Sequence, residues 1–136
     1  EHGGKLTTHY AGFYGNPEIL DYLLNKHYVP INYEDASGLL PVNWAILGTN
    51  APAVNFLIKN GNKLASSKAG VPRALDMAKQ LLHYKDTTET QNLMQMIILQ
   101  KILSGQSPTM KDILYNLEDI VLMLEKADED NKKIGP

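Results

Sequence analysis

Two stretches of the chain carry the same pattern of apolar and polar positions, 34 residues apart. In the first stretch a Gly15-Asn16-Pro17 turn precedes an apolar stripe at helical spacing. One helical pair of this size cannot bury its apolar stripe alone, so the repetition predicts a stack of such pairs. The corresponding positions are Gly4, His9, Ala11, Ile19-Leu20 and Tyr22-Leu23-Leu24 in the first stretch and Gly38, Asn43, Ala45, Ala53-Val54 and Phe56-Leu57-Ile58 in the second.

The pattern predicts two helices in the first unit. We expect a turn-prone stretch over residues 1–7, a short helix ending at Tyr14 and a second helix over residues 17–24. A glycine inside the short helix, Gly12, would let a neighbouring helix come close. Residues 28–33 then form an extended connector, as a stacked repeat requires.

The second unit carries clearer start and stop signals. Pro41 suits the first position of a helix that runs to Leu47. The partner helix over residues 53–59 ends at Asn60-Gly61, where glycine is a common C-cap.

The C-terminal part repeats less clearly. A third unit opens with a helix over residues 74–84, and the helix that includes residues 94–103 is apolar on all sides, so it must be covered on several faces. A helix from Ser107-Pro108 has one apolar and one charged face, as a terminal cap should, and residues 128–133 are expected to fray into solvent. Whether the end of the chain is a distorted repeat plus a cap or a separate helical hairpin stays open. The predicted domains are repeats over 1–104 (about 1–33, 34–66 and 67–104) and a capping helix and tail over 105–136.

Composition indicates one ordinary soluble domain. Of the 136 residues, 43% are hydrophobic and 21% charged, and the formal net charge is -2, which gives no reason to expect a nucleic-acid partner. No apolar run approaches the length of a membrane span. The absence of cysteine excludes disulfides and thiolate chemistry and fits a reducing, cytoplasmic location.

No catalytic or metal-binding constellation stands out. His2, His27 and His83 have no ligand spacing, and Asp128-Glu129-Asp130 lacks the glycine and distal glutamate of a calcium loop. Phosphate-binding loops and nucleophile motifs are absent from the sequence. We therefore expect no catalytic residue, no metal and no cofactor in this segment.

The repeated positions resemble the ankyrin-repeat family. The turn glycine, histidine, first alanine and second glycine of the family pattern stand at Gly4, His9, Ala11 and Gly15. The second unit keeps several further positions but has Asn43 for the histidine and Thr49 for the glycine. The matching positions there and in the third unit are Asp35, Gly38, Pro41, Ala45, Leu57, Gly61, Gly70 and Ala74-Leu75-Asp76-Met77-Ala78.

The resemblance implies an all-α, ankyrin-like solenoid of about three repeats closed by an amphipathic helix. It implies a protein-protein interaction module or scaffold that presents a rigid concave surface, with a monomer favoured. His9 would hydrogen-bond neighbouring backbone, and Trp44 would pack between helices. Phe13 and Tyr14 would meet the partner, the alternative being that one of them folds back onto the stack. The expected partner-binding residues are His2, Lys5, Phe13, Tyr14, Glu34, Ala36, Leu39, Leu47, Lys68 and Val71.

Two further hypotheses stay open. The chain starts with Glu1 inside a repeat, so it could be the substrate-recruiting or regulatory C-terminal part of a larger enzyme. All but one of its 13 basic residues are lysines, which fits a secreted bacterial effector acting in the host cytoplasm. Alternatively, the exposed first helical pair could mediate self-association through Phe13 or Ile19.

Overall fold

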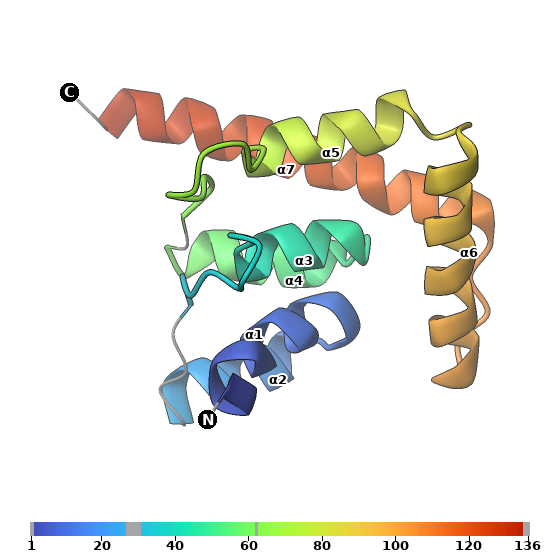
Figure 1. Cartoon of the computed structure of the whole chain (residues 1–136), viewed down its shortest axis with the longest axis horizontal. Helices are drawn as coiled ribbons and strands as arrows, with labels where there is room; N and C mark the ends of the chain where they lie inside the picture. Colours follow the sequence, from blue (N-terminus) through green and yellow to red (C-terminus); the bar gives the residue numbers. More distant parts are fainter. Residues whose placement is uncertain (1, 27–30, 62, 135–136) are drawn as a thin grey trace.

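The structure is a computed structural model. It describes residues 2–26, 31–61 and 63–134, and the side chains of these residues from Thr7 to Asn131. The described residues are helical and contain no strand, as the sequence predicts (Figure 1). The elements are α1 (His2–Tyr14), α2 (Pro17–Asp21) continued by a π-helical turn η1 (Tyr22–Lys26), α3 (Pro41–Leu47), α4 (Ala51–Lys59), α5 (Ala74–His83), α6 (Thr88–Leu103) and α7 (Met110–Ile134).

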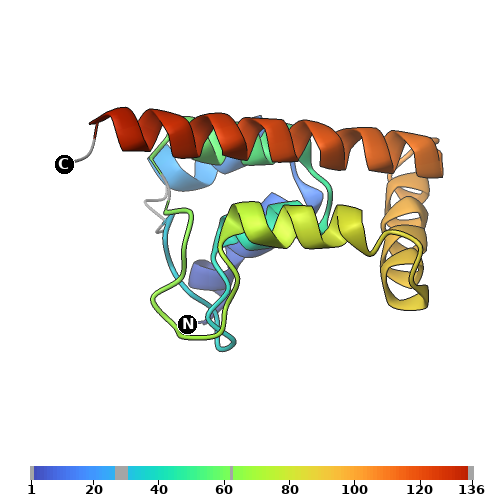
Figure 2. The ribbon, with the colours of Figure 1, turned by 90° about the horizontal axis from the view of Figure 1, so that it is seen from above.

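Six of the helices form two layers. The first layer consists of α1, α3 and α5, and the second layer of α2, α4 and α7. Helices of the two layers pack in the pairs α1–α2, α3–α4 and α5–α7, and α1 also contacts α4. Figure 2 shows the two layers from above, with the loops before α3 and α5 extending beyond the first layer. The core lies between the layers.

Glycines allow α1 to pack tightly against α3. A Cβ atom at Gly12 would lie 3.0 Å from the carbonyl oxygen of Pro41. At Gly48, just after α3, a Cβ atom would lie only 2.6 Å from the carbonyl oxygen of Phe13. The expectation that Gly12 permits a close approach of a neighbouring helix is confirmed.

Several predicted boundaries are confirmed and others are wrong. Helix α3 begins at Pro41, and Gly61 follows α4 with a φ of +79°, as a glycine C-cap requires. The predicted turn is wrong over residues 2–7, because α1 already begins at His2. The sequence did not predict a helix over His2, Gly3 and Gly4, because glycine has a low helix propensity.

The start and end of α7 also differ from the sequence prediction. The helix begins at Met110 rather than at Ser107-Pro108, because Thr109 and Asp112 cap it reciprocally: each backbone N–H donates to the other side chain, at 2.8 and 3.2 Å. At its other end α7 continues to Ile134, so the predicted fraying over residues 128–133 is wrong for its described part. Asp128 forms an ion pair with Arg73, the residue before α5, with Nη2 and Oδ1 3.0 Å apart.

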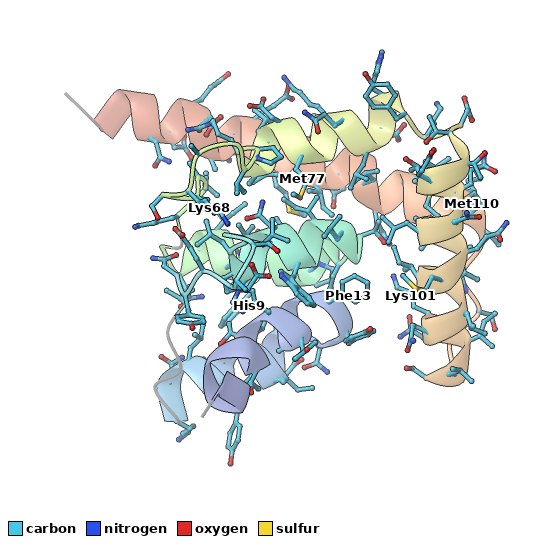
Figure 3. The ribbon with its side chains drawn as sticks, viewed as in Figure 1. His9, Phe13, Lys68, Met77, Lys101 and Met110 are labelled. Carbon is cyan, nitrogen blue, oxygen red and sulfur yellow. The ribbon has the colours of Figure 1, made fainter. Side chains whose placement is uncertain are left out.

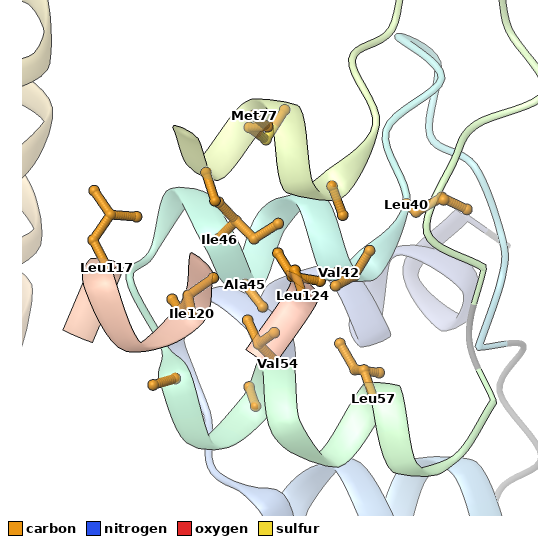
Figure 4. Close-up of a cluster of buried hydrophobic side chains, with 14 of the residues drawn as sticks. Leu40, Val42, Ala45, Ile46, Val54, Leu57, Met77, Leu117, Ile120 and Leu124 are labelled. Carbon is orange, nitrogen blue, oxygen red and sulfur yellow. The ribbon is translucent and has the colours of Figure 1, made fainter. Parts of the chain in front are cut away.

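The second-layer position beside α5 is taken by α7 and not by α6. Four α7 side chains at helical spacing are fully buried, and Figure 4 shows two of them, Ile120 and Leu124, among the buried side chains of α3 and α4. Lys79 of α5 also faces Glu125 of α7, with 3.6 Å between Nζ and Oε2. Because α7 has a continuous apolar face, it can cover α5 and α4 together. The four buried side chains are Ile113, Leu117, Ile120 and Leu124.

Helix α6 stands across the end of the layers and packs chiefly against α7 (Figures 1 and 2). It buries Thr90, Met94 and Ile97, whereas its other sides leave several apolar side chains exposed. The predicted covering of this helix on several faces is therefore not seen within the described residues. Among all the residues that the structure describes, no helix is both long enough and apolar enough to span a membrane. The exposed apolar side chains of α6 are Met96, Leu99, Ile102 and Leu103.

This arrangement makes a stability prediction. Leu117→Ala removes a fully buried side chain from the second layer and should lower the free energy of unfolding by about 2–5 kcal/mol. Leu103→Ala, at a side chain that is 74% exposed on α6, should change it by less than about 0.5 kcal/mol. Urea denaturation followed by circular dichroism measures both. Equal losses in the two variants would contradict the different roles of α6 and α7.

Candidate functional site

Four aromatic side chains of α1 and α3, Tyr10, Phe13, Tyr14 and Trp44, form one cluster on the first layer. We refer to them as the aromatic cluster. The ring centroids of Tyr10 and Trp44 are 5.3 Å apart, those of Phe13 and Trp44 6.4 Å and those of Phe13 and Tyr14 4.5 Å, all in edge-to-face geometry. Tyr10 and Tyr14 are 49% and 58% exposed, whereas Phe13 and Trp44 are half-buried. The cluster thus presents two tyrosines on a base of two partly covered rings.

Asp35 fixes the ring at the centre of the cluster. Its Oδ2 accepts a hydrogen bond from Nε1 of Trp44 at 2.9 Å. Its Oδ1 accepts from the backbone N–H groups of Ser37 and Leu39, both at 2.9 Å, which holds the loop before α3 in a turn. Burial raises the pKa of Asp35, but the hydrogen bonds from Leu39, Trp44 and Ser37 outweigh it, so that the pKa lies below its ordinary value.

His9 has a structural role, as the family resemblance implies. The side chain is fully buried, and Nε2 donates to the backbone carbonyl of Leu39 at 2.9 Å. Its ring lies edge-on to Tyr33 and Trp44, with centroids 6.2 and 5.7 Å away. His9 therefore links α1 to the loop that carries Asp35. Among the described residues, His, Asp and Glu side chains form no group of three or more that could hold a metal ion.

The loops before α3 and α5 are tied together at the other end of the first layer. The carboxylate of Glu34 accepts hydrogen bonds from the backbone N–H and the hydroxyl of Ser67, the shortest at 2.8 Å. These bonds lower the pKa of Glu34 against a smaller opposing effect of burial. Nζ of Lys68 donates to the carbonyl of Ala36 at 3.4 Å. Glu34 therefore serves chiefly to join the loops.

The predicted partner-binding residues do not form one patch. Phe13 and Tyr14 are the last two residues of α1. Figure 3 shows Phe13 far from Lys68, which lies in the loop before α5. Three of the predicted residues have exposed side chains: Tyr14, Ala36 and Lys68. A fourth, Glu34, is hydrogen-bonded to the loop before α5. The other four described residues are half-buried, and three of these, Phe13, Leu39 and Leu47, pack against the core, the fourth being Val71. The side chains of His2 and Lys5 lie outside the described residues, as does all of His27.

Gly48 and Trp44 both lie against α1. Gly48 is buried, because the backbone of Phe13 covers it. Trp44 does pack between helices, yet it also forms the base of the surface cluster. Sequence reasoning did not select Tyr10 or pair it with Trp44. The signal was present, because these two aromatic residues stand 34 residues apart at equivalent repeat positions.

Comparison with known proteins gives one relative that supports the repeat interpretation. The chain is 40% identical over 57 residues to a protein of Rickettsia bellii (strain RML369-C) named "Putative ankyrin repeat protein". The match covers 42% of this chain and about a third of the length of that relative. No protein-family model matches the chain. The similarity supports an ankyrin-like relationship for an all-helical chain.

The Asp35 carboxylate predicts a specific pH dependence of stability. Asparagine at this position keeps an oxygen for Ser37 and Leu39 but turns an N–H donor toward Trp44, so Asp35→Asn should cost about 1–2 kcal/mol at pH 7. Because the folded-state pKa is lowered, the aspartate contributes stability above its ordinary value of 3.8 and loses it as the pH falls through the folded-state value. The difference in melting temperature between wild type and Asp35→Asn should therefore shrink below about pH 4.

A double-mutant cycle controls this experiment. Trp44→Phe keeps an aromatic ring but removes the indole donor, so Asp35→Asn should cost less in the Trp44→Phe background than in wild type. A pH-independent difference, or equal costs in both backgrounds, would contradict the assigned role of Asp35.

Proposed function

We propose that this chain is a protein-binding module built as an ankyrin-like stack of three helical pairs, with the aromatic cluster as the centre of its contact surface. The exposed loop residues Ala36 and Lys68 lie at the other end of the first layer and form a separate part of the proposed contact surface. In this proposal the segment carries no catalysis itself, and its partner is another protein. The similarity to a relative named as an ankyrin repeat protein supports an interaction role.

The observation that carries the proposal is the exposure of Tyr10 and Tyr14 on a supported aromatic base. Both rings are about half exposed although each lies against another ring of the cluster. Tyrosine brings a large amphipathic area with few rotatable bonds, and such side chains are enriched among residues that dominate binding energy.

The supporting contacts favour a surface that is ordered before the partner arrives. Asp35 holds the Trp44 ring, and His9 ties α1 to the loop before α3. Glu34 and Ser67 join the two loops. Each of these bonds restricts the motion of a side chain or loop before the partner binds. The loss of conformational entropy on binding is therefore smaller.

The experiment is affinity capture followed by measurement on the purified pair. The wild-type segment is used to capture a partner from cell lysate, the partner is identified by mass spectrometry, and its dissociation constant is measured with purified protein. Tyr10→Ala/Tyr14→Ala should weaken binding by about 30-fold or more, which corresponds to a loss of about 2 kcal/mol.

Tyr115→Ala is the matched control, because Tyr115 is a tyrosine that is 68% exposed on α7. It should change the dissociation constant by no more than about threefold. Unchanged binding by the Tyr10→Ala/Tyr14→Ala variant, or an equal loss with Tyr115→Ala, would contradict the proposed surface.

A further inference from the structure

A cavity of about 340 Å³ lies beside the aromatic cluster. One wall comes from the α1–α2 and α3–α4 turns, including Phe13, Tyr14 and Thr49, and the other from α6 and the segment after it, including Lys101. Figure 3 places Lys101 on α6 opposite Phe13 at the end of α1. The position of α6 across the end of the layers thus creates a site that the helical pairs alone do not form.

The cavity carries a single positive charge. Lys101 is the only charged residue among those that line it. No carboxylate of the described residues lies within ion-pair distance of its ammonium group. Burial lowers the pKa of Lys101, and the more distant carboxylate of Asp112 opposes this. A half-buried ammonium without a close counter-ion is a costly arrangement that an entering anion would relieve.

Polar groups without hydrogen-bond partners among the described residues line the same cavity as this charge. The side-chain amides of Gln100, Gln106 and Asn116 line the cavity and form no hydrogen bond with other described residues. Thr49 also lines the cavity, and its Oγ1 is buried without a hydrogen-bond partner among the described residues. Amide N–H groups are suitable donors to a carboxylate already held by a lysine.

Thr49 also adopts an unusual backbone conformation, with a φ of +49°. A β-branched residue is strained in this left-handed region, and strained residues cluster at ligand sites. Thr49 is one of the residues of the α3–α4 turn that line the cavity.

Part of the remaining lining is apolar and includes Phe13, Pro17, Pro52 and Ile97, beside the polar residues Asn16, Asn50 and Ser104. A cavity of this volume takes a ligand larger than an inorganic ion. An inorganic anion would satisfy Lys101 and leave the apolar wall uncovered. The lining therefore matches a ligand that carries a carboxylate next to an apolar group.

We propose that this cavity binds an acidic segment of the partner protein, with a glutamate or aspartate carboxylate at Lys101 and an adjacent apolar side chain against Phe13 and Ile97. This inference rests on the proposed protein-binding function and adds the chemistry of the bound segment. Tyr14 belongs both to the aromatic cluster and to the cavity, so one partner can occupy the two continuously.

The test is an NMR titration with two capped peptides, acetyl-Leu-Glu-Leu-amide and acetyl-Leu-Gln-Leu-amide. The glutamate peptide should cause saturable shifts in backbone amides of the cavity residues and bind at least roughly fivefold more tightly than the glutamine peptide. Lys101→Met keeps the apolar stem of the lysine and should abolish the difference between the peptides. Lys111→Met, at an exposed lysine of α7, is the matched control and should preserve it.

Three outcomes would overturn the inference. The wild type could bind both peptides equally or neither, and this comparison does not depend on the folding of any variant. Lys101→Met and Lys111→Met could have the same effect. Inorganic phosphate could produce the same shifts at lower concentration than the glutamate peptide, which would indicate a small-anion site. If a partner identified by capture depends on Tyr10 and Tyr14 while the peptide test fails, the proposed function stands and only the cavity assignment falls.

Discussion

A pair of short helices has too little apolar surface to fold alone, and every pair in this chain depends on its neighbour. Helices α3 and α4 lie between the other two pairs, and their inner side chains Ile46, Val54 and Leu57 are fully buried (Figure 4). The α1–α2 pair closes one side through the tight contact at Gly12. The opposite side is closed by α5 with α7, which buries a continuous face because its apolar residues recur at helical spacing.

Polar contacts convert this stack into a surface of defined shape. His9 of α1 donates a hydrogen bond to the loop before α3. Asp35 of that loop accepts hydrogen bonds from the loop's own backbone and from the indole of Trp44. The exposed tyrosines of the aromatic cluster therefore rest on groups that are already fixed by the fold. Because Asp35 is ionised at neutral pH, this support has the strength of a charged hydrogen bond and is sensitive to acid.

The sequence was most informative where local chemistry decides the structure. Pro41 and Gly61 marked the ends of α3 and α4, and the spacing of Ile113, Leu117 and Ile120 identified the buried face of α7. Periodicity shows which face of a helix is buried but not which helix covers it. It therefore could not predict that α7, rather than α6, packs beside α5. The cavity at Lys101 depends on that same long-range placement and carried no local signal. Tyr10 and Trp44, by contrast, could have been selected from their equivalent positions in the repeat.

The central claim is that α7, rather than α6, completes the third helical pair and stabilises the stack. Hydrogen–deuterium exchange of backbone amides, followed residue by residue by NMR, tests it most directly. The claim predicts that amides of α7 around Leu117 and Ile120 exchange as slowly as those of α3 and α4, through global unfolding, while amides of α6 exchange faster through local opening. Fast exchange throughout α7, together with full protection of α6, would contradict it.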